Sequence, residues 1–386
     1  MKILLVNNFS CPKGGAEVSL LNTGKLLKEK KHHVYYFFAD KELKKTKNNL
    51  KRVFKLLYSL EARKKISQKL DKTKPDIVHL NNIYHHLSPS IIDEVKRKKI
   101  PLVMTLHDYK LVCAIYKLWR NGKVCQECKN EKYISILKNK CNLKGNLAES
   151  FLLWMEMVLH HKILHIYEKV DLFISPSRFL VKQFRQMGFK NKIVYLPNFV
   201  FLNKRKQSQI KETKTIVYFG RLTPEKGLLT LIKAVKNLPI ILKIIGDGNL
   251  KFKLEKLVLK EKINNVKFLG WLDQKKLKAE IKKSMFTILA SEWPENNPRA
   301  IIESFALGKP VLASKIGGIP ELVKDKKNGL LFEPGNIKEL RNKIIWMITH
   351  RQKRKEMGGK THFLIRKNYH QEIYYKKLIN LYKSIL

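Results

Sequence analysis

Short apolar runs alternate with longer segments whose apolar residues recur at helical spacing, and this alternation continues along most of the chain. The short runs are typical of buried strands, and the longer segments are typical of amphipathic helices. Because strands that alternate with helices form parallel sheets, the pattern predicts an α/β protein with two Rossmann-like, doubly wound domains. The predicted strands are residues 3–7, 34–38, 77–80, 102–106, 172–175, 193–196, 215–219, 241–245, 266–269, 286–289 and 310–313.

A polar stretch without an apolar period divides these strands into two sets. The chain has 386 residues, which is more than one hydrophobic core usually serves. We therefore place an N-terminal domain at residues 1–200, a linker at 201–214 and a C-terminal domain at 215–365. Residues 366–386 predict a last helix, because their apolar side chains recur at helical spacing.

Sheets of this type bind ligands beyond the carboxyl ends of their strands, so the loops after residues 7, 106, 219, 245 and 289 are expected to line a cleft. In the first loop Gly14 and Gly15 open a helix and allow the backbone to approach a phosphate, although an ordinary strand-to-helix turn also uses glycine. His107 and Asp108 follow the strand that ends at residue 106. They are either a structural pair or site residues.

Two basic residues follow the first predicted strand of the second domain, within the segment Gly220–Gly227. The Arg221 guanidinium presents a fork of donors and Lys226 a point charge, so together they are suited to clamp a diphosphate. Basic residues alone are weak evidence for a phosphate site in so basic a chain. These two, however, lie between glycines at the end of a strand, which strengthens the prediction. The next strand ends at Gly246–Gly248, a glycine turn that lacks the third glycine of a dinucleotide-binding motif.

The segment Ser291–Glu303 contains a predicted helix start. Asn297 is a favourable N-cap and Pro298 suits the first helical position. The amides of the next residues, Arg299 and Ala300 among them, then lack intrahelical partners and form an anion site at the positive end of the helix dipole.

Two carboxylates flank this helix start. Glu295 lies before the cap, and Glu303 lies about 9 Å along the helix axis. An elongated ligand with hydroxyl groups at both ends and phosphate in the middle fits this layout, and a nucleotide sugar has that shape. The alternative is an ordinary capped helix with two surface acids.

Lys and Arg outnumber Asp and Glu by 79 to 32, which gives a net charge of +47 that attracts polyanions. The even spread of lysine favours a solvated basic surface over a dedicated binding patch. Residues 41–74 are denser in lysine, and an apolar stripe there is formed by Val53, Phe54, Leu56, Leu57 and Leu60. A basic amphipathic helix of this kind either lies on an anionic membrane surface or packs its stripe on its own domain.

The first residues form a short strand pattern without the apolar region and cleavage site of a signal peptide, so we expect a cytoplasmic protein. The most apolar stretch, residues 151–167, contains Glu156 and several basic residues and predicts a buried or interfacial helix rather than a membrane span. Peripheral attachment to the inner membrane face is compatible with both observations.

Four of the five cysteines follow His107 and Asp108, and two of them are separated by two residues. A cytoplasmic chain argues against disulfides. Four thiols with one such pair suit a structural zinc site, and the alternatives are reduced buried cysteines or a redox pair. The four residues are Cys113, Cys125, Cys128 and Cys141.

Taken together, these residues resemble the family 4 retaining glycosyltransferases, which have the GT-B fold of two Rossmann-like domains facing across a cleft. The resemblance covers nearly the whole chain, and its specificity comes from the order of the motifs rather than from any one of them. They are Gly14-Gly15-Ala16-Glu17, His107-Asp108, Pro197-Asn198, Gly220-Arg221 with Glu225-Lys226-Gly227, Gly246-Asp247-Gly248, Glu295 with Glu303, and Gly317-Gly318-Ile319-Pro320-Glu321.

The resemblance implies a role for each matching position. The donor diphosphate is bound by Arg221 and Lys226, and the acceptor is recognised by the first domain, where Asp108 lies. The last helix crosses back to the first domain in this fold. The remaining donor contacts are Glu295 with the sugar, Glu303 with the ribose, His107 with the sugar near its anomeric carbon, and Gly15, Gly220, Gly246, Asn297, Arg299 and Ala300 around the phosphates.

The implied reaction moves a hexose from a UDP- or GDP-sugar to an acceptor hydroxyl with retention of configuration. The leaving phosphate takes the acceptor proton in this family, so no dedicated protein base is required. No Asp-x-Asp metal motif follows a predicted strand, so we expect activity without a divalent ion. The family often has Gly-Phe-Gly where this chain has Asn296-Asn297-Pro298, which leaves the donor sugar open.

The acceptor is expected to be a saccharide or lipid-linked acceptor in lipopolysaccharide, capsule or lipid-linked oligosaccharide synthesis. Two other functions fit parts of the pattern. A nucleotide-sugar epimerase with the same fold would release free sugar, and a basic nucleic-acid-binding protein would use the net charge. The sequence has no recognisable nucleic-acid reading motif, and carboxylates at Glu295 and Glu303 would repel a phosphate backbone.

Overall fold

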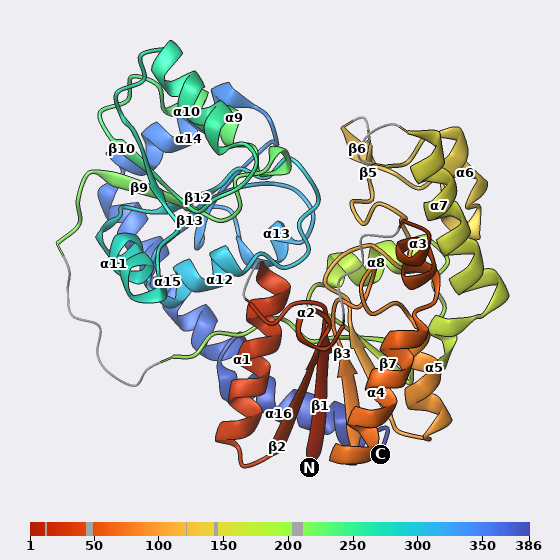
Figure 1. Cartoon of the computed structure of the whole chain (residues 1–386). Helices are drawn as coiled ribbons and strands as arrows, with labels where there is room; N and C mark the ends of the chain where they lie inside the picture. Colours follow the sequence, from red (N-terminus) through yellow and green to blue (C-terminus); the bar gives the residue numbers. More distant parts are fainter. Residues whose placement is uncertain (12–13, 44–48, 121, 143–145, 203–210) are drawn as a thin grey trace. The chain divides into compact units, whose positions relative to one another are not determined.

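The computed structural model describes residues 1–11, 14–43, 49–120, 122–142, 146–202 and 211–386, with only the backbone described at 49–52 (Figure 1). The described chain forms two compact units. Unit 1 comprises Met1–Pro197 and Tyr374–Leu386, and unit 2 comprises Asn198–Ile373. Most of the predicted linker at 201–214 lies outside the described residues.

Unit 1 is built on a six-stranded sheet in the order β2-β1-β3-β4-β7-β8, and every neighbouring pair is parallel. The strand order reverses between β1 and β3, which is the point where sheets of this type usually bind ligands. Strands β3 and β7 are buried at every residue. The strands are β1 (Lys2–Asn7), β2 (His33–Phe38), β3 (Ile77–Leu80), β4 (Leu102–Thr105), β7 (Leu172–Ser175) and β8 (Ile193–Tyr195).

The helices of unit 1 connect these strands, and between β4 and β7 the chain also forms a small two-stranded hairpin. These elements are α1 (Gly15–Glu29), α2 (Ala39–Glu42), α3 (Asn49–Leu57), α4 (Leu60–Thr73), α5 (Ser90–Arg97), β5 (Trp119–Arg120), β6 (Lys123–Val124), η1 (Lys129–Glu131), α6 (Ile134–Lys138), α7 (Leu147–Met157), η2 (Val158–Ile163), η3 (Ile166–Lys169) and α8 (Arg178–Gln186).

Unit 2 has a second six-stranded parallel sheet, in the order β11-β10-β9-β12-β13-β14, whose order reverses between β9 and β12. Strand β9 is buried along its whole length because helices cover both faces. The strands are β9 (Thr215–Phe219), β10 (Ile241–Ile245), β11 (Val266–Gly270), β12 (Thr287–Leu289), β13 (Val311–Ser314) and β14 (Gly329–Phe332).

The remaining helices belong to unit 2, except that the last one is mostly part of unit 1. They are η4 (Pro224–Lys226), α9 (Leu228–Val235), α10 (Lys251–Lys260), α11 (Gln274–Lys283), α12 (Arg299–Ala306), α13 (Ile319–Leu322), α14 (Ile337–Thr349), α15 (Arg351–Asn368) and α16 (Gln371–Lys383).

The predicted fold class is confirmed, and each predicted strand occurs within one residue of its expected bounds. Two features were missed. Strand β14 is a run of only four residues, and the hairpin strands β5 and β6 have two residues each, so neither carries a readable period.

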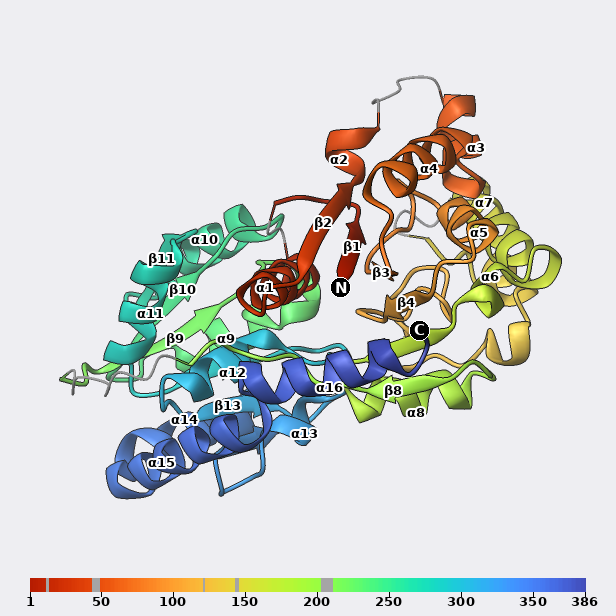
Figure 2. The same cartoon turned by 90° about the horizontal axis from the view of Figure 1, so that it is seen from below.

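Helix α16, whose course Figure 2 shows, is held on unit 1 by a buried hydrogen-bonded chain of side chains. Tyr382 Oη lies 2.6 Å from His79 Nδ1, and His79 Nε2 lies 2.7 Å from Thr105 Oγ1. Thr23 on α1 contacts Tyr374 at 3.2 Å between the two hydroxyl oxygens. These contacts join the last helix to β3, β4 and α1 of the first sheet.

The apolar segments that raised the question of a membrane pack within unit 1. Residues 151–167 form the end of α7, a π-helical turn and a 3₁₀ turn, and α3 packs against α7. Val53 and Leu57 of the predicted stripe are half-buried, whereas Phe54 and Leu60 remain exposed. No helix in the described part of the chain is both long and apolar enough to cross a bilayer.

Candidate active site

The carboxyl ends of β9 and β12, which are neighbours in the sheet of unit 2, bring together two predicted site residues that are far apart in sequence. Lys226 lies in the turn η4 after β9, and its Nζ donates to Glu295 Oε1 at 2.5 Å. Ser291 Oγ donates to the same carboxylate oxygen, also at 2.5 Å. The Lys226 and Glu295 side chains are only 13% and 8% exposed. The pair is therefore a largely desolvated charge pair at the switch point of the sheet.

These contacts keep the Glu295 carboxylate ionised. Burial alone would raise the pKa of Glu295, but the charge and hydrogen bond of Lys226, with a hydrogen bond from Ser291, hold that pKa below its ordinary value. An ionised carboxylate accepts hydrogen bonds and does not donate them. Glu295 is therefore suited to receive hydrogen bonds from hydroxyl groups of a ligand.

The loop that carries Glu295 is supported by the motif Gly317-Gly318. The amide of Gly318 donates to the carbonyl oxygen of Glu295 at 2.7 Å. Gly317 has a φ of +61°, and a Cβ added to it would lie 2.3 Å from that same carbonyl oxygen. Because a side chain there would be both strained and blocked, glycine at 317 is required for this loop to pack.

Arg221 and the predicted glycines lie at the same edge of the sheet. Arg221 is exposed at the end of β9, and its carbonyl oxygen accepts a hydrogen bond from Tyr218 Oη at 2.8 Å. The amide of Gly220 donates to Ile245 O, and a Cβ on Gly246 would lie 2.0 Å from the carbonyl oxygen of Gly220. The ends of β9 and β10 thus touch, and Arg221 is exposed beside them.

The predicted helix start after Asn297 is correct in place but wrong in detail. Helix α12 begins at Arg299, and its N-cap is Pro298, which has extended backbone angles and no capping side chain. The Asn297 side chain does not cap the helix because its Oδ1 accepts a hydrogen bond from Asn198 Nδ2 at 3.0 Å. The amide of Ile301 already donates to Pro298 O, so the predicted anion site is left with the amides of Arg299 and Ala300.

Two buried donors at this helix start make no hydrogen bond in the described part of the chain. They are Nδ2 of Asn297 and Nε of Arg299. A buried donor without a partner is costly, roughly 1–3 kcal/mol, and is uncommon in native structures. Both donors would be satisfied by an acceptor-rich ligand such as a phosphate.

Glu303 lies on α12, where its Oε1 accepts from Nη2 of Arg299 at 3.2 Å. The Glu303 side chain is 24% exposed, so one of its oxygens can still meet a ligand. The spacing of four residues between the partners is the one that brings side chains together on a helix.

In unit 1, His107 and Asp108 follow β4 as predicted. His107 Nε2 lies 2.7 Å from Oδ1 of Asn81, which follows β3. The sequence reading gave no role to Asn81, although an asparagine directly after a buried strand at the switch point was a signal that could have found it. Gly15 is the first residue of α1, whose N-cap is Gly14 in an extended conformation.

Asp108 has an unusual environment. Burial raises the pKa of Asp108 to about 6, with a further contribution from Glu17, against the hydrogen bond and the charge of Lys110. The backbone amide of Lys110 donates to Asp108 Oδ1 at 2.9 Å. The folded state therefore binds a proton at Asp108 between about pH 4 and about pH 6, where the unfolded chain has lost it.

We expect Asp108→Asn to gain stability relative to the unmodified protein as pH rises. The pKa of Asp108 is raised on folding, so its contribution to the free energy of unfolding falls through this range, whereas asparagine does not titrate. The advantage of the variant should grow by about 1 kcal/mol between about pH 5 and about pH 8. Urea unfolding of both proteins at the two pH values measures this advantage. A difference in unfolding free energy that does not change with pH would contradict the raised pKa of Asp108.

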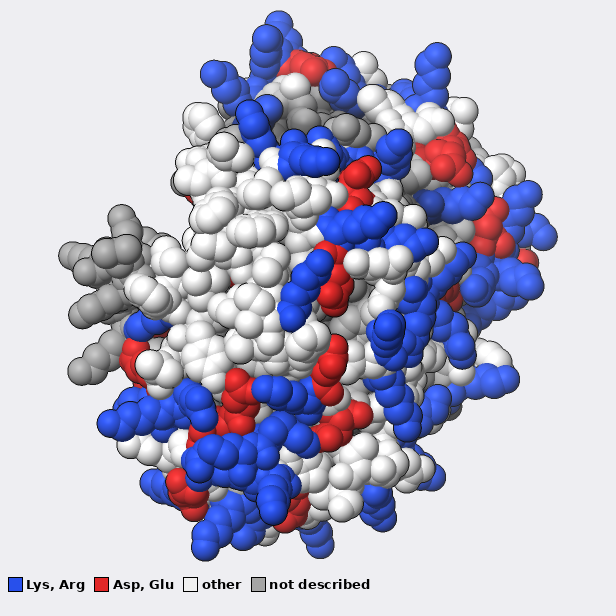
Figure 3. Space-filling view, turned by 90° about the vertical axis from the view of Figure 1, so that its right-hand side faces the viewer, with Lys and Arg blue, Asp and Glu red and all other residues white. Residues whose placement is uncertain are grey.

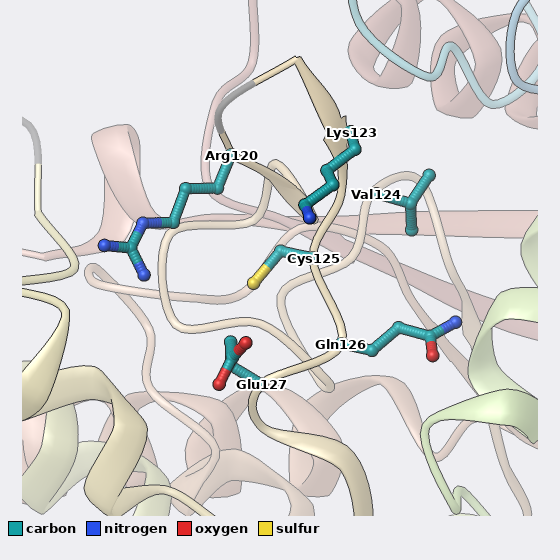
Figure 4. A pocket seen from close by; sticks show the side chains of 6 residues that line it. All are labelled: Arg120, Lys123, Val124, Cys125, Gln126 and Glu127. Carbon is teal, nitrogen blue, oxygen red and sulfur yellow. The ribbon is translucent and has the colours of Figure 1, made fainter.

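The four predicted zinc ligands are free thiols, and each is partly exposed. Among the residues that the structure describes, no three His, Cys, Asp or Glu side chains are already arranged around a point that a metal ion would occupy. Cys125 lines a pocket, shown in Figure 4, together with Arg120, Lys123, Val124, Gln126 and Glu127. The predicted zinc site stays a prediction.

Two family models match consecutive parts of the chain. The model described as Glycosyltransferase Family 4 matches residues 13–204, and the model described as Glycosyl transferases group 1 matches residues 200–362. The first ends where the second begins, close to the start of unit 2 at Asn198. Together the two models cover residues 13–362, which include each predicted site residue and every strand of the two six-stranded sheets except β1.

Two curated relatives match about half of the chain. An uncharacterized glycosyltransferase of Methanocaldococcus jannaschii, MJ1178, is 31% identical over 188 residues, which are 49% of this chain and 52% of the relative. The lipopolysaccharide core biosynthesis glycosyltransferase LpsE of Rhizobium meliloti is 26% identical over 208 residues, which are 52% of this chain and 60% of the relative. The matched regions thus span little more than half of each relative.

Solved structures share the whole architecture. The crystal structure of Anabaena Alr3699/HepE in complex with UDP-glucose matches over 100% of both chains with a TM-score of 0.70 at 21% identity. At this identity the match concerns the fold, and it confirms the predicted GT-B architecture.

Proposed function

This chain belongs to the glycosyltransferases of group 1 and family 4, and from that premise we propose that it is a retaining hexosyltransferase. It moves a hexose from a nucleotide-diphosphate sugar to the hydroxyl group of an acceptor. The observation that carries this proposal is the buried Lys226–Glu295 pair at the switch point of β9 and β12.

The charges around that pair match the parts of a nucleotide sugar. Lys226 and the exposed Arg221 supply positive charge for the diphosphate, and the start of α12 adds two amides and two unpaired buried donors. Glu295 is ionised and accepts hydrogen bonds from sugar hydroxyls. Glu303, further along α12, accepts hydrogen bonds from the ribose. In this proposal the cations and N–H donors bind the diphosphate of the donor, and the two carboxylates bind its hydroxyl groups.

We propose UDP as the nucleotide of the donor. The support is the similar fold of Alr3699/HepE, whose crystal structure contains UDP-glucose. The sugar is left to experiment, because Asn296 and Asn297 replace the small and aromatic residues that the family often has beside the sugar.

In the proposed reaction the bond between the anomeric carbon and the departing diphosphate oxygen breaks, and the acceptor oxygen bonds to the same face of that carbon. The acceptor proton passes to the departing phosphate, so atoms and charge balance without a protein base. Lys226, Arg221 and the amides of α12 stabilise the negative charge that grows on the diphosphate. Preorganised groups of this kind are usually the largest contribution to catalysis. His107 of unit 1 is proposed to contact the sugar near the anomeric carbon.

The acceptor is proposed to be a glycan or glycolipid of the cell surface. The support is the similarity to LpsE, a glycosyltransferase of lipopolysaccharide core biosynthesis. Unit 1 is proposed to bind the acceptor through the surroundings of Asp108, whose carboxyl group is half-buried and has a raised pKa.

We propose that the protein attaches to an anionic membrane on the cytoplasmic side. The support is one surface of unit 1. We call it the basic–apolar surface, and it is formed by η1, α6, α7 and η2. Figure 3 views this side of unit 1 and shows Lys and Arg over much of the face. Its exposed apolar residues are Ile134, Leu147, Phe151 and Ile163, and its exposed lysines are Lys129, Lys132, Lys138, Lys140 and Lys162. Exposed apolar side chains among lysines are typical of a membrane-binding surface.

We expect the protein to sediment with vesicles that contain phosphatidylglycerol, and to be released by high salt. Phe151→Asp should weaken this binding because it removes a 49% exposed aromatic ring from the surface and adds negative charge. Phe252→Asp on α10 is the control, since Phe252 is 79% exposed and lies in unit 2. Equal binding to vesicles of zwitterionic lipid would contradict the proposal.

The transfer reaction itself is tested with radiolabelled donors and purified protein. We expect label from a UDP-sugar to move to a glycan acceptor, with retained anomeric configuration by NMR, and at an unchanged rate in EDTA because cationic residues take the place of a divalent ion. Loss of the rate in EDTA would refute the metal-independent reaction. Release of free sugar without an acceptor would point to an epimerase, and no use of any nucleotide sugar would remove the proposed function.

A further inference from the structure

Three buried asparagines lie at the carboxyl ends of β1 and β3, where the strand order of the first sheet reverses. Asn7, Asn8 and Asn81 are 0%, 5% and 4% exposed. Amide side chains are mostly found at the surface of proteins, and their burial without hydrogen bonds is costly. The hydrogen-bond partners of these three residues therefore show what the cluster positions.

Asn7 and Asn8 fix the loop that follows β3. Asn7 Oδ1 accepts from the amide of Asn82 at 3.0 Å, and the amide of Asn8 donates to the carbonyl oxygen of Asn82 at 2.8 Å. The amide of Asn81 donates to the carbonyl oxygen of Val6 at 2.9 Å. The backbone on both sides of the Asn81 side chain is thus held by the end of β1.

The side chain of Asn81 binds a residue that follows the neighbouring strand. Strands β3 and β4 pair in parallel, and Asn81 directly follows β3, whereas His107 lies shortly after β4. Asn81 Oδ1 lies 2.7 Å from His107 Nε2. An amide oxygen has no hydrogen to donate, so the proton of this hydrogen bond is on Nε2. Asn81 thereby selects the tautomer of the neutral ring in which Nδ1 carries no proton.

An amide is a suitable partner for a histidine that has to stay neutral. The amide oxygen is uncharged, whereas a carboxylate in its place would favour the charged imidazolium. In the proposed reaction positive charge grows on the sugar ring as the bond to the diphosphate breaks. An imidazolium near the anomeric carbon would oppose that charge. The neutral ring of His107 is therefore the form that the reaction requires.

We propose that Asn81 is a positioning residue, which holds His107 in one orientation as the neutral ring with its proton on Nε2. This proposal rests on the proposed transferase function, in which His107 contacts the donor sugar. Asn81 acts through His107 and not on the sugar itself. A hydrogen bond to one ring nitrogen generally fixes both the tautomer and the orientation of a functional histidine.

The ¹⁵N NMR signals of the histidine ring nitrogens test the proposal without any substrate. We expect Nε2 of His107 to be protonated and Nδ1 to be unprotonated, with the signals assigned by their absence from His107→Gln. Asn81→Leu removes the acceptor at nearly the same side-chain volume, and it should give a mixture of the two tautomers.

Asn8→Leu is the matched control for the loss of a buried amide. Asn8 is similarly buried, and its side chain binds the backbone of Tyr84 at 2.7 Å and of Leu87 at 3.4 Å. We expect this variant to lose stability in urea unfolding and to keep the His107 proton on Nε2. A change of tautomer that is confined to Asn81→Leu therefore reports the contact with His107 and not the general loss of a buried amide.

A double-variant cycle tests the effect of Asn81 on the reaction. Asn81→Leu should lower kcat by about 10- to 100-fold and leave the affinity for UDP unchanged, because the loss concerns the orientation of His107. In the His107→Gln protein the same substitution should cause no further loss of kcat, since the ring that Asn81 positions is absent. A residue that serves the fold alone would lower kcat by the same factor in both proteins.

Asn81→Asp keeps an acceptor in place but gives it a charge. We expect its rate, relative to the unmodified protein, to rise about 5- to 10-fold between about pH 7 and about pH 9, as the imidazolium that the carboxylate favours loses its proton. Neighbouring groups keep their charge in this range. Burial lowers the pKa of His79 on β3 to about 3, so His79 stays neutral, and burial raises the pKa of Asp108 to about 6, so Asp108 is already mostly ionised.

Three results would overturn the proposal: a proton on Nδ1 of His107 in the unmodified protein, an unchanged tautomer in Asn81→Leu, and an equal loss of kcat from Asn81→Leu with and without His107. The NMR measurement needs no transferase activity. A failure of the proposed function can therefore be told from a failure of this proposal.

Discussion

Lys226→Ala should lower kcat/KM for sugar transfer by about 100- to 1,000-fold. The Lys226 side chain is 13% exposed and lies at the switch point, where its charge is weakly screened by water. Its removal takes away positive charge at the place where the departing diphosphate gains negative charge. Steady-state kinetics with a UDP-sugar and a saturating acceptor measure the loss.

The same substitution also leaves the buried Glu295 carboxylate without its cation, so a loss of stability has to be separated from the loss of activity. The double variant Lys226→Ala with Glu295→Gln removes both charges, and we expect it to regain stability without regaining activity. Lys243→Ala is a matched control, since Lys243 and Glu280 form an ion pair of the same 2.5 Å length elsewhere in unit 2.

Kinetics of these variants distinguish a site from a structural ion pair. If Lys226 serves the fold alone, kcat/KM will follow stability in all three variants, and the double variant will regain its rate. An unchanged rate in Lys226→Ala would remove Lys226 from the catalytic residues.

Gly317→Ala should destabilise the protein by about 3–5 kcal/mol and abolish donor binding. The new Cβ would lie 2.3 Å from Glu295 O and 2.6 Å from Glu295 N, both backbone atoms that cannot rotate away. The φ of +61° adds strain for any residue other than glycine. Relief of the overlap moves the loop that carries Glu295, so stability and binding are lost together.

Gly270→Ala separates the effect of backbone strain from the effect of the overlap with Glu295. Gly270 has a nearly identical φ of +66°, but a Cβ there meets no atom within 4 Å. We expect it to destabilise the protein by about 1 kcal/mol, through backbone strain alone, and to leave donor affinity unchanged. Urea unfolding and calorimetric titration with UDP measure both quantities. Equal losses of unfolding free energy in the two variants would show that the packing of Gly317 on the Glu295 loop does not contribute to stability.

The strands could be read from the sequence because each is a local apolar run with turn residues at its ends. Parallel pairing of strands such as β9 and β10 followed from the helices between them. Arg221, Lys226 and Glu295 were predicted as site residues because they follow strands, and all strands of a parallel sheet end at the same edge. Local pattern and general topology were sufficient for these features.

The errors and omissions have a common cause, which is contact between distant residues. Asn297 was expected to cap α12, but Asn198, 99 positions earlier, holds its side chain. The contact of Asn81 with His107, 26 positions away, was not predicted, although Asn81 directly follows a buried strand. The role of Gly317 depends on the backbone of Glu295. None of these partners can be inferred from the local sequence of the other.

The central claim is that Arg221, Lys226 and the start of α12 bind the diphosphate of a nucleotide sugar. Calorimetric titration with uridine, UMP and UDP in EDTA tests it most directly, since the three ligands differ only in their phosphates. The account predicts a stepwise gain in affinity with each phosphate, and a loss of the UDP gain in Arg221→Ala and in Lys226→Ala. Equal affinities for the three ligands, or UDP binding that both variants retain in full, would contradict it.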